Sequence, residues 1–405
     1  MDYTPTQNGG YLSSYWPRIT HPTHKGWLWK MEPLRTAVIG YGKIAHLHAQ
    51  ALRSLPQSDF VAVCGRDAAR AQTFAQQYGA AAFTSVRTMI EQAGVQAVVI
   101  CTPHPAHAAP AIEAAACGAH VLVEKPLAAS LADCDAMIAA ADRAGVKLGV
   151  VSQRRFYEPV RRMRQAIDDG KIGQPVLGSV ILYGWRDEAY YRSDPWRGQW
   201  LAEGGGVLVN QAPHQLDLLQ WFMGPIEEVF GYWANLNHPF IEVEDTAVAV
   251  LRFKNGGLGS IVASNSQKPG IYGKVHVHGS NGSSVGVQTE GGAMFIAGVT
   301  SILEPPYNDL WTIPGEESMV EQWRAGDRAA FEQGDPTLRY IMLQNQDFLD
   351  AILEGREPAV TGHDGRVTVE IFTAIYRSQR NRAPVRFPLA AHDGADDFDG
   401  RLVAR

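Results

Sequence analysis

The sequence has few cysteines, no long apolar run and no excess of positive charge, and each shortage argues against a class of protein. The four cysteines, Cys64, Cys101, Cys117 and Cys134, form no C-x-x-C pair. This excludes a disulfide framework and a zinc ribbon, and it suits a reducing cytosol. No run of about 18 apolar residues occurs, so no membrane-spanning helix is predicted. With 36 Lys and Arg against 42 Asp and Glu, the net charge is −6. This balance argues against nucleic-acid binding, which needs a basic face.

What is present indicates a globular protein of roughly two to three domains, since 45% of its 405 residues are apolar and 19% are charged. We expect it to be cytoplasmic. The first 30 residues hold Trp16, Trp27 and Trp29 but no apolar core of a secretory signal. An upstream start codon before Met31 and a family-specific arm explain this segment equally well. The predicted division is an N-terminal extension (1–30), two domains (31–152 and 153–389) and a mobile tail (390–405).

Strands and helices alternate through the first domain. Thr36–Ile39 is a short β-branched strand, followed by a glycine turn and then a helix over Ile44–Leu55. This alternation predicts a parallel sheet covered on both faces, as in a Rossmann dinucleotide-binding domain. The further strands expected there are Phe60–Cys64, Ala81–Phe83, Gln96–Cys101, His120–Glu124 and Lys147–Val151, and the further helices are Ala68–Tyr78, Ala106–Cys117 and Leu131–Ala144.

The second domain has longer strands that follow one another directly, which predicts a mostly antiparallel sheet. A single helix over Gly206–Phe222 is expected to interrupt them. A helix over Pro159–Gly170 is expected to precede them, and two late helices, Tyr340–Leu353 and Arg366–Arg380, to pack back on either domain. The strands expected are Val176–Trp185, Ile226–Trp233, Thr246–Phe253, Gly257–Ser264 and Gly273–His278.

A G-x-G-x-x-A motif at Gly40, Gly42 and Ala45 lies between the first strand and the first helix. The first glycine permits the tight turn, the second lets the backbone approach a pyrophosphate, and the alanine lets the helix pack on the strand. The free N–H groups of the helix N-terminus favour an anion. Because the flanking elements fit, the motif predicts a dinucleotide site that includes Lys43 and Ile44.

The end of the second strand bears on the choice of nucleotide. An NAD site usually has an acid there for the ribose hydroxyl, but Gly65 occupies this position and Arg66 follows it. An arginine accommodates a 2′-phosphate, so NADP is favoured over NAD. The alternatives are that Asp67 reaches the ribose while Arg66 stacks on adenine, or that Asp67 caps the next helix.

Four short motifs follow one another along the chain: Cys101-Thr102-Pro103, Glu124-Lys125-Pro126, Glu203-Gly204-Gly205-Gly206 and Asn210-x-x-x-His214-x-x-Asp217. In order and spacing they resemble those of the Gfo/Idh/MocA family of glucose-fructose oxidoreductases and inositol dehydrogenases. The resemblance extends from about Arg35 to Leu389. It implies an α/β protein with an N-terminal Rossmann domain, a C-terminal α/β domain with a large, mostly antiparallel open sheet, and assembly as a homodimer or homotetramer.

The resemblance implies that Lys125 is catalytic, and Asn210 and His214 complete the predicted catalytic set. At i and i+4 on one helix, Asn210 and His214 share a face, and His214 is suited to taking a proton from a hydroxyl. Family members often have aspartate where this chain has Asn210. Asparagine orients a histidine but cannot stabilise its charged form, so either His214 is the base or Lys125 carries more of the proton transfer.

The substrate site is predicted from an aromatic and basic stretch, Tyr190–Trp200, together with the catalytic helix. Asp217 either binds a substrate hydroxyl or pairs with an arginine, and the stretch from Gln153 to Arg155 is expected near the nicotinamide or in solvent. The residues expected to bind substrate are Lys125, Arg155, Tyr191, Trp196, Arg197, Trp200, Asn210, His214 and Asp217. The residues expected to contact the cofactor are Gly40, Gly42, Lys43, Ile44, Ala45, Gly65, Arg66, Asp67, Thr102, Pro103, His107, Glu124, Lys125 and Gln153.

These features predict an NAD(P)-dependent dehydrogenase or reductase acting on a CH–OH group of a sugar, a sugar derivative or an inositol-like ring. No metal is expected, because Pro105 spoils the helical spacing of His104 and His107. No membrane or nucleic-acid partner is expected either. The alternatives are a redox-neutral lyase or glycoside hydrolase that oxidises its substrate transiently, a nucleotide-sensing regulator without chemistry, and a dehydrogenase of a small aromatic dihydrodiol.

Overall fold

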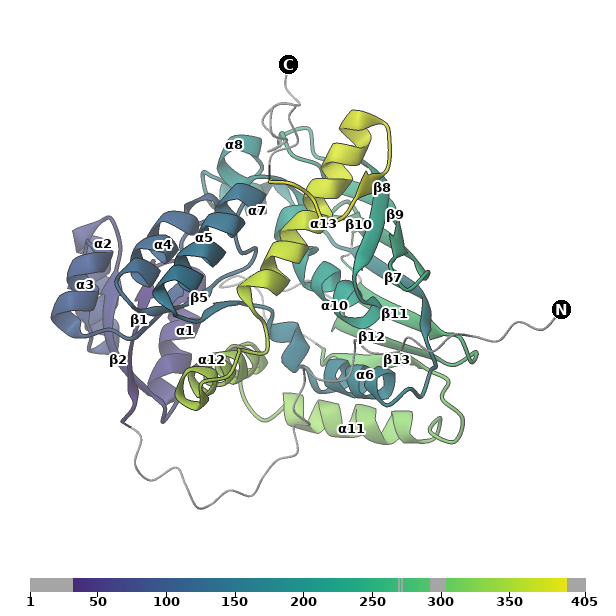
Figure 1. Cartoon of the computed structure of the whole chain (residues 1–405), viewed down its shortest axis with the longest axis horizontal. Coiled ribbons are helices and arrows are strands. Elements are labelled where there is room, and N and C mark those ends of the chain that lie inside the picture. Colours follow the sequence, from purple (N-terminus) through teal and green to yellow (C-terminus); the bar gives the residue numbers. More distant parts are fainter. Residues whose placement is uncertain (1–31, 269, 271, 292–303, 392–405) are drawn as a thin grey trace. The chain divides into compact units, whose positions relative to one another are not determined.

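The N-terminal domain is built on a six-stranded sheet in the order β3-β2-β1-β4-β5-β6 (Figure 1). All of its strand pairs are parallel, as the alternation of strands and helices predicts. The computed structural model describes residues 32–268, 270, 272–291 and 304–391. The predicted extension (1–30) and residues 392–405 of the predicted tail lie outside the described residues. The strands are β1 (Leu34–Ile39), β2 (Ser58–Cys64), β3 (Ala81–Phe83), β4 (Ala97–Ile100), β5 (His120–Val123) and β6 (Leu148–Val150).

Local sequence signals mark the ends of the helices that cover this sheet. Ser85 and Ser130 accept hydrogen bonds at helix N-termini, and Gly94 and Gly145 end the same helices in the left-handed conformation. The helix that begins after Ser85 is missing from the sequence-based prediction, although both of its caps are visible in the sequence. The helices are α1 (Lys43–Ser54), α2 (Ala68–Tyr78), α3 (Val86–Ala93), α4 (Ala108–Ala116) and α5 (Leu131–Ala144).

The C-terminal domain has an eight-stranded sheet in the order β13-β12-β11-β7-β10-β9-β8-β14. Strands β7 and β10 are parallel, and the other neighbours are antiparallel, which confirms the predicted fold class. The sequence-based prediction lacks the last two long strands and the final short one. The strands are β7 (Pro175–Tyr183), β8 (Ile226–Ala234), β9 (Thr246–Phe253), β10 (Leu258–Ser264), β11 (Tyr272–Gly279), β12 (Ser284–Gly291), β13 (Tyr307–Trp311) and β14 (Val385–Arg386).

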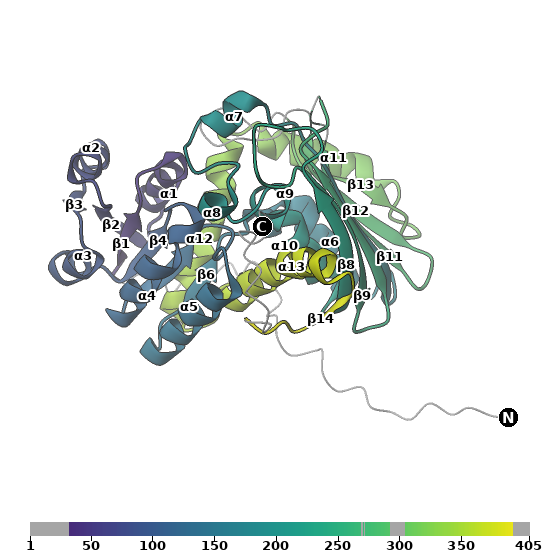
Figure 2. The ribbon, with the colours of Figure 1, turned by 90° about the horizontal axis from the view of Figure 1, so that it is seen from above.

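One face of this larger sheet is covered by helices (Figure 2). The helices α6 (Glu158–Asp168), α10 (Pro213–Met223) and α13 (Gly362–Asn381) pack on it. Along β9 the side chains alternate, so Ala249 and Leu251 are buried, whereas Val248 and Val250 are exposed. This period of two is what a sheet buried on one face requires.

The late helices join the two domains. Helix α12 (Pro336–Glu354) packs on α1 of the N-terminal domain, and α13 contacts both β8 and α5. Phe348 and Leu349 of α12 enter the same apolar cluster as Leu52 of α1. Helix α11 (Met319–Phe331) packs on β13 and α6. In the part of the chain that the structure describes, no helix combines the length and the apolar character needed to cross a membrane.

Candidate active site

The turn between β1 and α1 leaves backbone N–H groups open at the N-terminus of a helix. Gly40 has a φ of +112°, and a Cβ at this position would lie 2.7 Å from the carbonyl oxygen of Cys101, so glycine is required. Among the described residues, a Cβ on Gly42 would meet no atom within 4 Å, and no side chain caps α1. Ala45 is fully buried against the sheet. These residues fit a dinucleotide, whose pyrophosphate would lie on the first turn of α1.

The segment after β2 is arranged around the ring of Tyr41. A Cβ on Gly65 would lie 2.1 Å from this ring, and the Arg70 guanidinium stacks over it at 4.5 Å. Asp67 accepts a hydrogen bond from the backbone N–H of Arg70 at 3.0 Å and thereby caps α2. Arg66 is exposed and lines the cavity described next. Asp67 therefore forms the cap of the helix-capping alternative, and it does not line the cavity.

A cavity of about 1080 Å³ begins at the glycine turn and extends into the C-terminal domain. Its volume lies just above the range for small-molecule sites, which is roughly 300–1,000 Å³. The predicted site residues that line it are Gly40, Gly42, Lys43, Ile44, Gly65, Arg66, Thr102, Pro103, His107, Glu124, Lys125, Gln153, Trp196, Arg197, Asn210 and His214. The predicted site residues that do not line it are Ala45, Asp67, Arg155, Tyr191, Trp200 and Asp217.

Lys125 follows the carboxyl end of β5 and points toward the C-terminal domain. Its Nζ donates a hydrogen bond of 2.8 Å to the main-chain carbonyl of Asn210. Burial lowers the pKa of Lys125 to about 8, opposed by the charge of Glu124 and assisted by Arg154. Burial also opposes ionisation of Glu124, but its hydrogen bond with His48 and the nearby charges bring the Glu124 pKa below its usual value. Lys125 is therefore an amine that changes charge close to neutral pH.

The cis peptide bond at Lys125–Pro126 lies beside a buried histidine. The ring of His107 lies between the carbonyl of Pro126, at 3.0 Å from Nδ1, and the carbonyl of Thr102, at 2.9 Å from Nε2. His107 thus connects the turns that follow β4 and β5 at the edge of the cavity.

His214 lies on α10 and is buried, with its ring in the cavity wall. Burial lowers the pKa of His214 well below its ordinary value, and the positive charges of Arg154 and Lys125 lower it further. Among the described residues, none hydrogen-bonds its ring nitrogens. The imidazole is therefore neutral near pH 7 and available to a bound molecule.

The expected pairing of Asn210 with His214 is not formed. The predicted single helix Gly206–Phe222 is broken into α9 (Val207–Asn210) and α10, which begins at Pro213. Proline has no N–H to donate to the preceding turn, so the helix ends before it. The side-chain amide of Asn210 donates instead to the Tyr190 hydroxyl at 3.2 Å and to Glu203.

Glu203 is a functional candidate that the sequence-based prediction missed. It ends α8 (Trp200–Glu203) and is almost completely buried. One carboxylate oxygen accepts from the backbone N–H of Gly198 at 2.6 Å, and the other accepts from Asn210. Burial raises the pKa of Glu203 to about 7, against the lowering effect of these hydrogen bonds. In the sequence the residue is visible only as the acid before three glycines.

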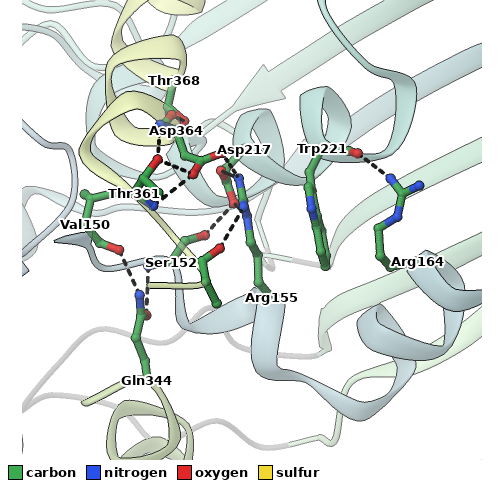
Figure 3. Close-up of polar contacts among 11 residues, drawn as sticks. Val150, Ser152, Arg155, Arg164, Asp217, Trp221, Gln344, Thr361, Asp364 and Thr368 are labelled. Atoms are coloured by element: carbon green, nitrogen blue, oxygen red, sulfur yellow. Dashed lines mark hydrogen bonds and ion pairs between the residues drawn. The ribbon is translucent and has the colours of Figure 1, made fainter. Parts of the chain in front are cut away.

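Arg155 and Asp217 form a buried ion pair instead of binding substrate (Figure 3). The guanidinium of Arg155 makes two hydrogen bonds of 2.6 and 2.8 Å to Asp217, and a third of 3.1 Å to Asp364. Ser152 donates to the same Asp217 carboxylate at 2.6 Å. Burial opposes the charge on Arg155, but the two carboxylates raise its pKa above the usual value. The pair connects η2 (Gln153–Phe156) to α10 and α13, so Asp217 takes the arginine-pairing alternative, and neither residue lines the cavity.

Two aromatic assignments are also corrected. Trp200 is buried between the rings of Trp233 and Tyr376, at centroid distances of 5.4 and 5.5 Å. Tyr191 packs on His238 and turns away from the cavity. Its neighbour Tyr190 lines the cavity instead, and its hydroxyl accepts from Arg197 at 2.6 Å.

The cavity wall contains further residues that are absent from the predicted site. They include a second buried arginine, Arg186, which stacks over the Tyr190 ring at 5.2 Å. His104 lies edge-on to Trp196 at 5.4 Å. Among the lining residues, His104, Arg186 and Gln211 are absent from the predicted site, whereas Tyr190 and Arg154 fall within the two predicted stretches, Tyr190–Trp200 and Gln153 to Arg155.

Comparisons with known proteins agree with this arrangement. A family model described as an oxidoreductase family with an NAD-binding Rossmann fold matches residues 34–152, and the GFO/IDH/MocA C-terminal domain matches residues 160–285. The chain is 28% identical to myo-inositol 2-dehydrogenase of Thermotoga maritima, over 87% of this chain and 98% of that protein. It is 30% identical to the uncharacterized oxidoreductase YrbE of Bacillus subtilis, over 62% of this chain and 72% of that protein.

A solved structure shows the same likeness in three dimensions. The WlbA dehydrogenase of Bordetella pertussis, crystallised with NADH and UDP-GlcNAcA, is 30% identical to this chain and matches it with a TM-score of 0.74. The match covers 89% of this chain and all of that chain.

Proposed function

Because the chain belongs to the Gfo/Idh/MocA family of NAD-binding oxidoreductases, we propose that it transfers a hydride between a nicotinamide cofactor and a carbinol carbon of a sugar, a sugar derivative or an inositol-like ring. The resemblance found in the sequence motifs and the dehydrogenase class are confirmed by these matches. The substrate class is supported by two relatives, a myo-inositol dehydrogenase and a dehydrogenase crystallised with a UDP-sugar.

One observation carries the proposal: Lys125 and His214 line the same cavity as the glycine turn. A cofactor bound at the turn and a ring bound beside Lys125 would therefore share one space. When bound, the nicotinamide ring supplies the site that accepts or gives the hydride. Trp196 and Arg197 offer an aromatic face and hydrogen-bond donors for a polyhydroxylated ring.

In this proposal Lys125 exchanges the hydroxyl proton with the reacting carbinol. A general base works best when its pKa lies near the working pH, and the Lys125 pKa of about 8 meets this condition. His214 is a weaker base because burial lowers its pKa well below the ordinary value. Its neutral ring instead accepts a hydrogen bond from a substrate hydroxyl and orients the ring. This favours the alternative in which Lys125 carries more of the proton transfer.

We further propose that the cofactor is NADP rather than NAD. The support is that Gly65 replaces the usual ribose-binding acid, and that Arg66 and Arg70 both line this end of the cavity. The carboxylate of Asp67 is occupied at the start of α2. An arginine pair without a competing acid suits a 2′-phosphate.

The first test is a panel of inositols, aldoses, glycosides and cyclic diols, each with NAD and NADP in parallel, followed by nicotinamide absorbance. We expect reduction of the cofactor with one class of ring alcohol, and faster reduction of NADP than of NAD. Faster reduction of NAD would overturn the NADP assignment alone. Cleavage or elimination of a substrate without net cofactor reduction would favour the redox-neutral lyase or hydrolase. Nucleotide binding without any turnover would favour a sensor.

We also propose that the protein assembles as a homodimer or homotetramer through the outward face of the larger sheet. The side chains of Tyr232, Val248, Val250 and Leu258 on this face are 46–66% exposed. Val248 lies directly opposite Tyr232 on the neighbouring strand, so the exposed apolar side chains adjoin one another. A contiguous apolar surface of this kind is typical of an interface.

Replacing Val250 with glutamate is expected to shift the protein to the monomer, because a charge would be buried at the centre of the interface. Size-exclusion chromatography with light scattering measures this. Met319→Glu, on the exposed side of α11, serves as the control and should keep the wild-type mass. A monomeric wild-type protein would contradict the assembly proposal.

A further inference from the structure

Glu203 is connected to Lys125 through a single residue. The Asn210 side chain donates to the Glu203 carboxylate, and the Asn210 main-chain carbonyl accepts from the Lys125 ammonium at 2.8 Å. Glu203 is itself held by the backbone N–H of Gly198 at 2.6 Å and is 1% exposed. The position of the lysine nitrogen therefore depends on a carboxylate that does not line the cavity.

Apart from Glu203, most of the charged groups around Lys125 are positive, so the negative charge of Glu203 bears directly on the protonation of the lysine. The other charged or titratable groups that face it are Glu124 of the preceding residue, Arg154 of η2, Arg197 after α7 (Glu188–Arg192), His104 of η1 (His104–Ala106) and His214 of α10. Two of these groups are permanent cations, and Glu124 is hydrogen-bonded to His48. Among these described groups, Glu124 and Glu203 are thus the only two carboxylates whose charge acts on Lys125.

The surroundings of Glu203 hold it near the point of ionisation. Lys125 and Arg197 face it with positive charge, while the phenols of Tyr190, Tyr191 and Tyr376 contribute no charge near pH 7. Burial raises the pKa of Glu203 to about 7. The hydrogen bonds from Gly198 and Asn210 and the positive charges of Arg197 and Lys125 favour its ionised form.

We propose that Glu203 is a positioning residue for the proton transfer at Lys125. It fixes Asn210, whose main-chain carbonyl holds the lysine nitrogen. It also supplies the negative charge near the lysine that the neutral side chain of Asn210 cannot supply. This inference rests on the proposed function. The carboxylate acts on Lys125 from α8, on the other side of the glycine segment, instead of from α9, which carries Asn210.

The test is the pH profile of kcat/KM for alcohol oxidation in Glu203→Gln. In the wild type, oxidation should rise with pH through about 8, because Lys125 must be neutral to accept a proton. Removing the neighbouring negative charge makes the ammonium form less favourable. The rise should therefore move by about one pH unit toward lower pH. Glu203→Asp keeps the charge, so its rise should stay near the wild-type pH while kcat falls.

Glu244 provides a matched control. It is also a buried glutamate with a pKa raised by burial to about 7, but it binds the backbone N–H groups of Gly206 and Leu208 and the Tyr376 hydroxyl. Glu244→Gln should lower thermal stability without moving the pH profile. If Glu203→Gln behaves in the same way, its role is only structural and the inference is overturned.

Three further outcomes separate the inference from the function on which it rests. If Glu203→Gln does not fold, Glu203→Asp decides alone, and an unchanged kcat in that variant overturns the positioning role. A wild-type protein that oxidises no alcohol overturns the proposed function, whereas a wild-type profile without a rise near pH 8 overturns the proton transfer at Lys125; either result removes the inference before any Glu203 variant is measured. A wild-type rise near pH 8 that persists in Glu203→Gln overturns the inference alone.

Discussion

Replacing Lys125 with methionine is expected to lower kcat by about 10²–10⁴-fold, the usual contribution of a general acid or base. Methionine keeps the length of the side chain but provides no proton acceptor. Nucleotide affinity should change little, because the glycine turn and α1 hold the pyrophosphate. Steady-state kinetics on the substrate found in the panel measures the first effect, and titration with the nucleotide measures the second.

A surface lysine serves as the control for this variant. Lys147 forms an ion pair with the exposed Glu357, so Lys147→Met should keep wild-type turnover. If Lys125→Met loses nucleotide binding together with activity, Lys125 anchors the cofactor and the proposed proton transfer is wrong.

Asp217→Ala is expected to destabilise the folded protein by roughly 3–5 kcal/mol, because Arg155 would remain buried without its main partner. The side chains of this pair are only 2% and 5% exposed, so water cannot replace the lost carboxylate. Thermal and urea unfolding midpoints measure the effect. Because Asp217 does not line the cavity, KM should be unchanged at temperatures where the variant is folded.

The matched comparison is Asp168→Ala. Asp168 pairs with Arg164 within α6 but is about half exposed, and an exposed pair contributes at most about 1 kcal/mol. If both variants unfold alike, the buried Arg155–Asp217 pair contributes no more to stability than the exposed pair. A raised KM in Asp217→Ala at unchanged stability would restore its assignment to the substrate site.

The sequence predicts well the helices and strands whose formation depends on neighbouring residues alone. The β-branched run at Thr36–Ile39 and the G-x-G turn indicate β1 and the start of α1, since these signals depend on backbone conformation alone. The break before Pro213 was also visible, but the apolar pattern over Gly206–Phe222 continues through it and hides the two helices. A proline inside an apolar pattern should therefore end the predicted helix.

Residues in irregular segments are harder to assign to a site. Tyr190 and Tyr191 are adjacent, and only the arrangement of α7 shows which one lines the cavity. Arg155 and Asp217 are 62 positions apart, so their pairing follows from tertiary packing and not from spacing. The role of Glu203 depends in the same way on contacts with Gly198 and Asn210 that no local pattern encodes.

The packing of α12 on α1 has a consequence for biosynthesis. The six-stranded sheet is complete in sequence once β6 ends at Val150, but Phe348 and Leu349, which cover Leu52, are translated about 200 residues later. At about 5–20 residues per second, the delay is roughly 10–40 s. During this time the apolar face of α1 is uncovered at the ribosome, where a chaperone would protect it, and a gene truncated after the nucleotide-binding segment should yield an aggregating fragment.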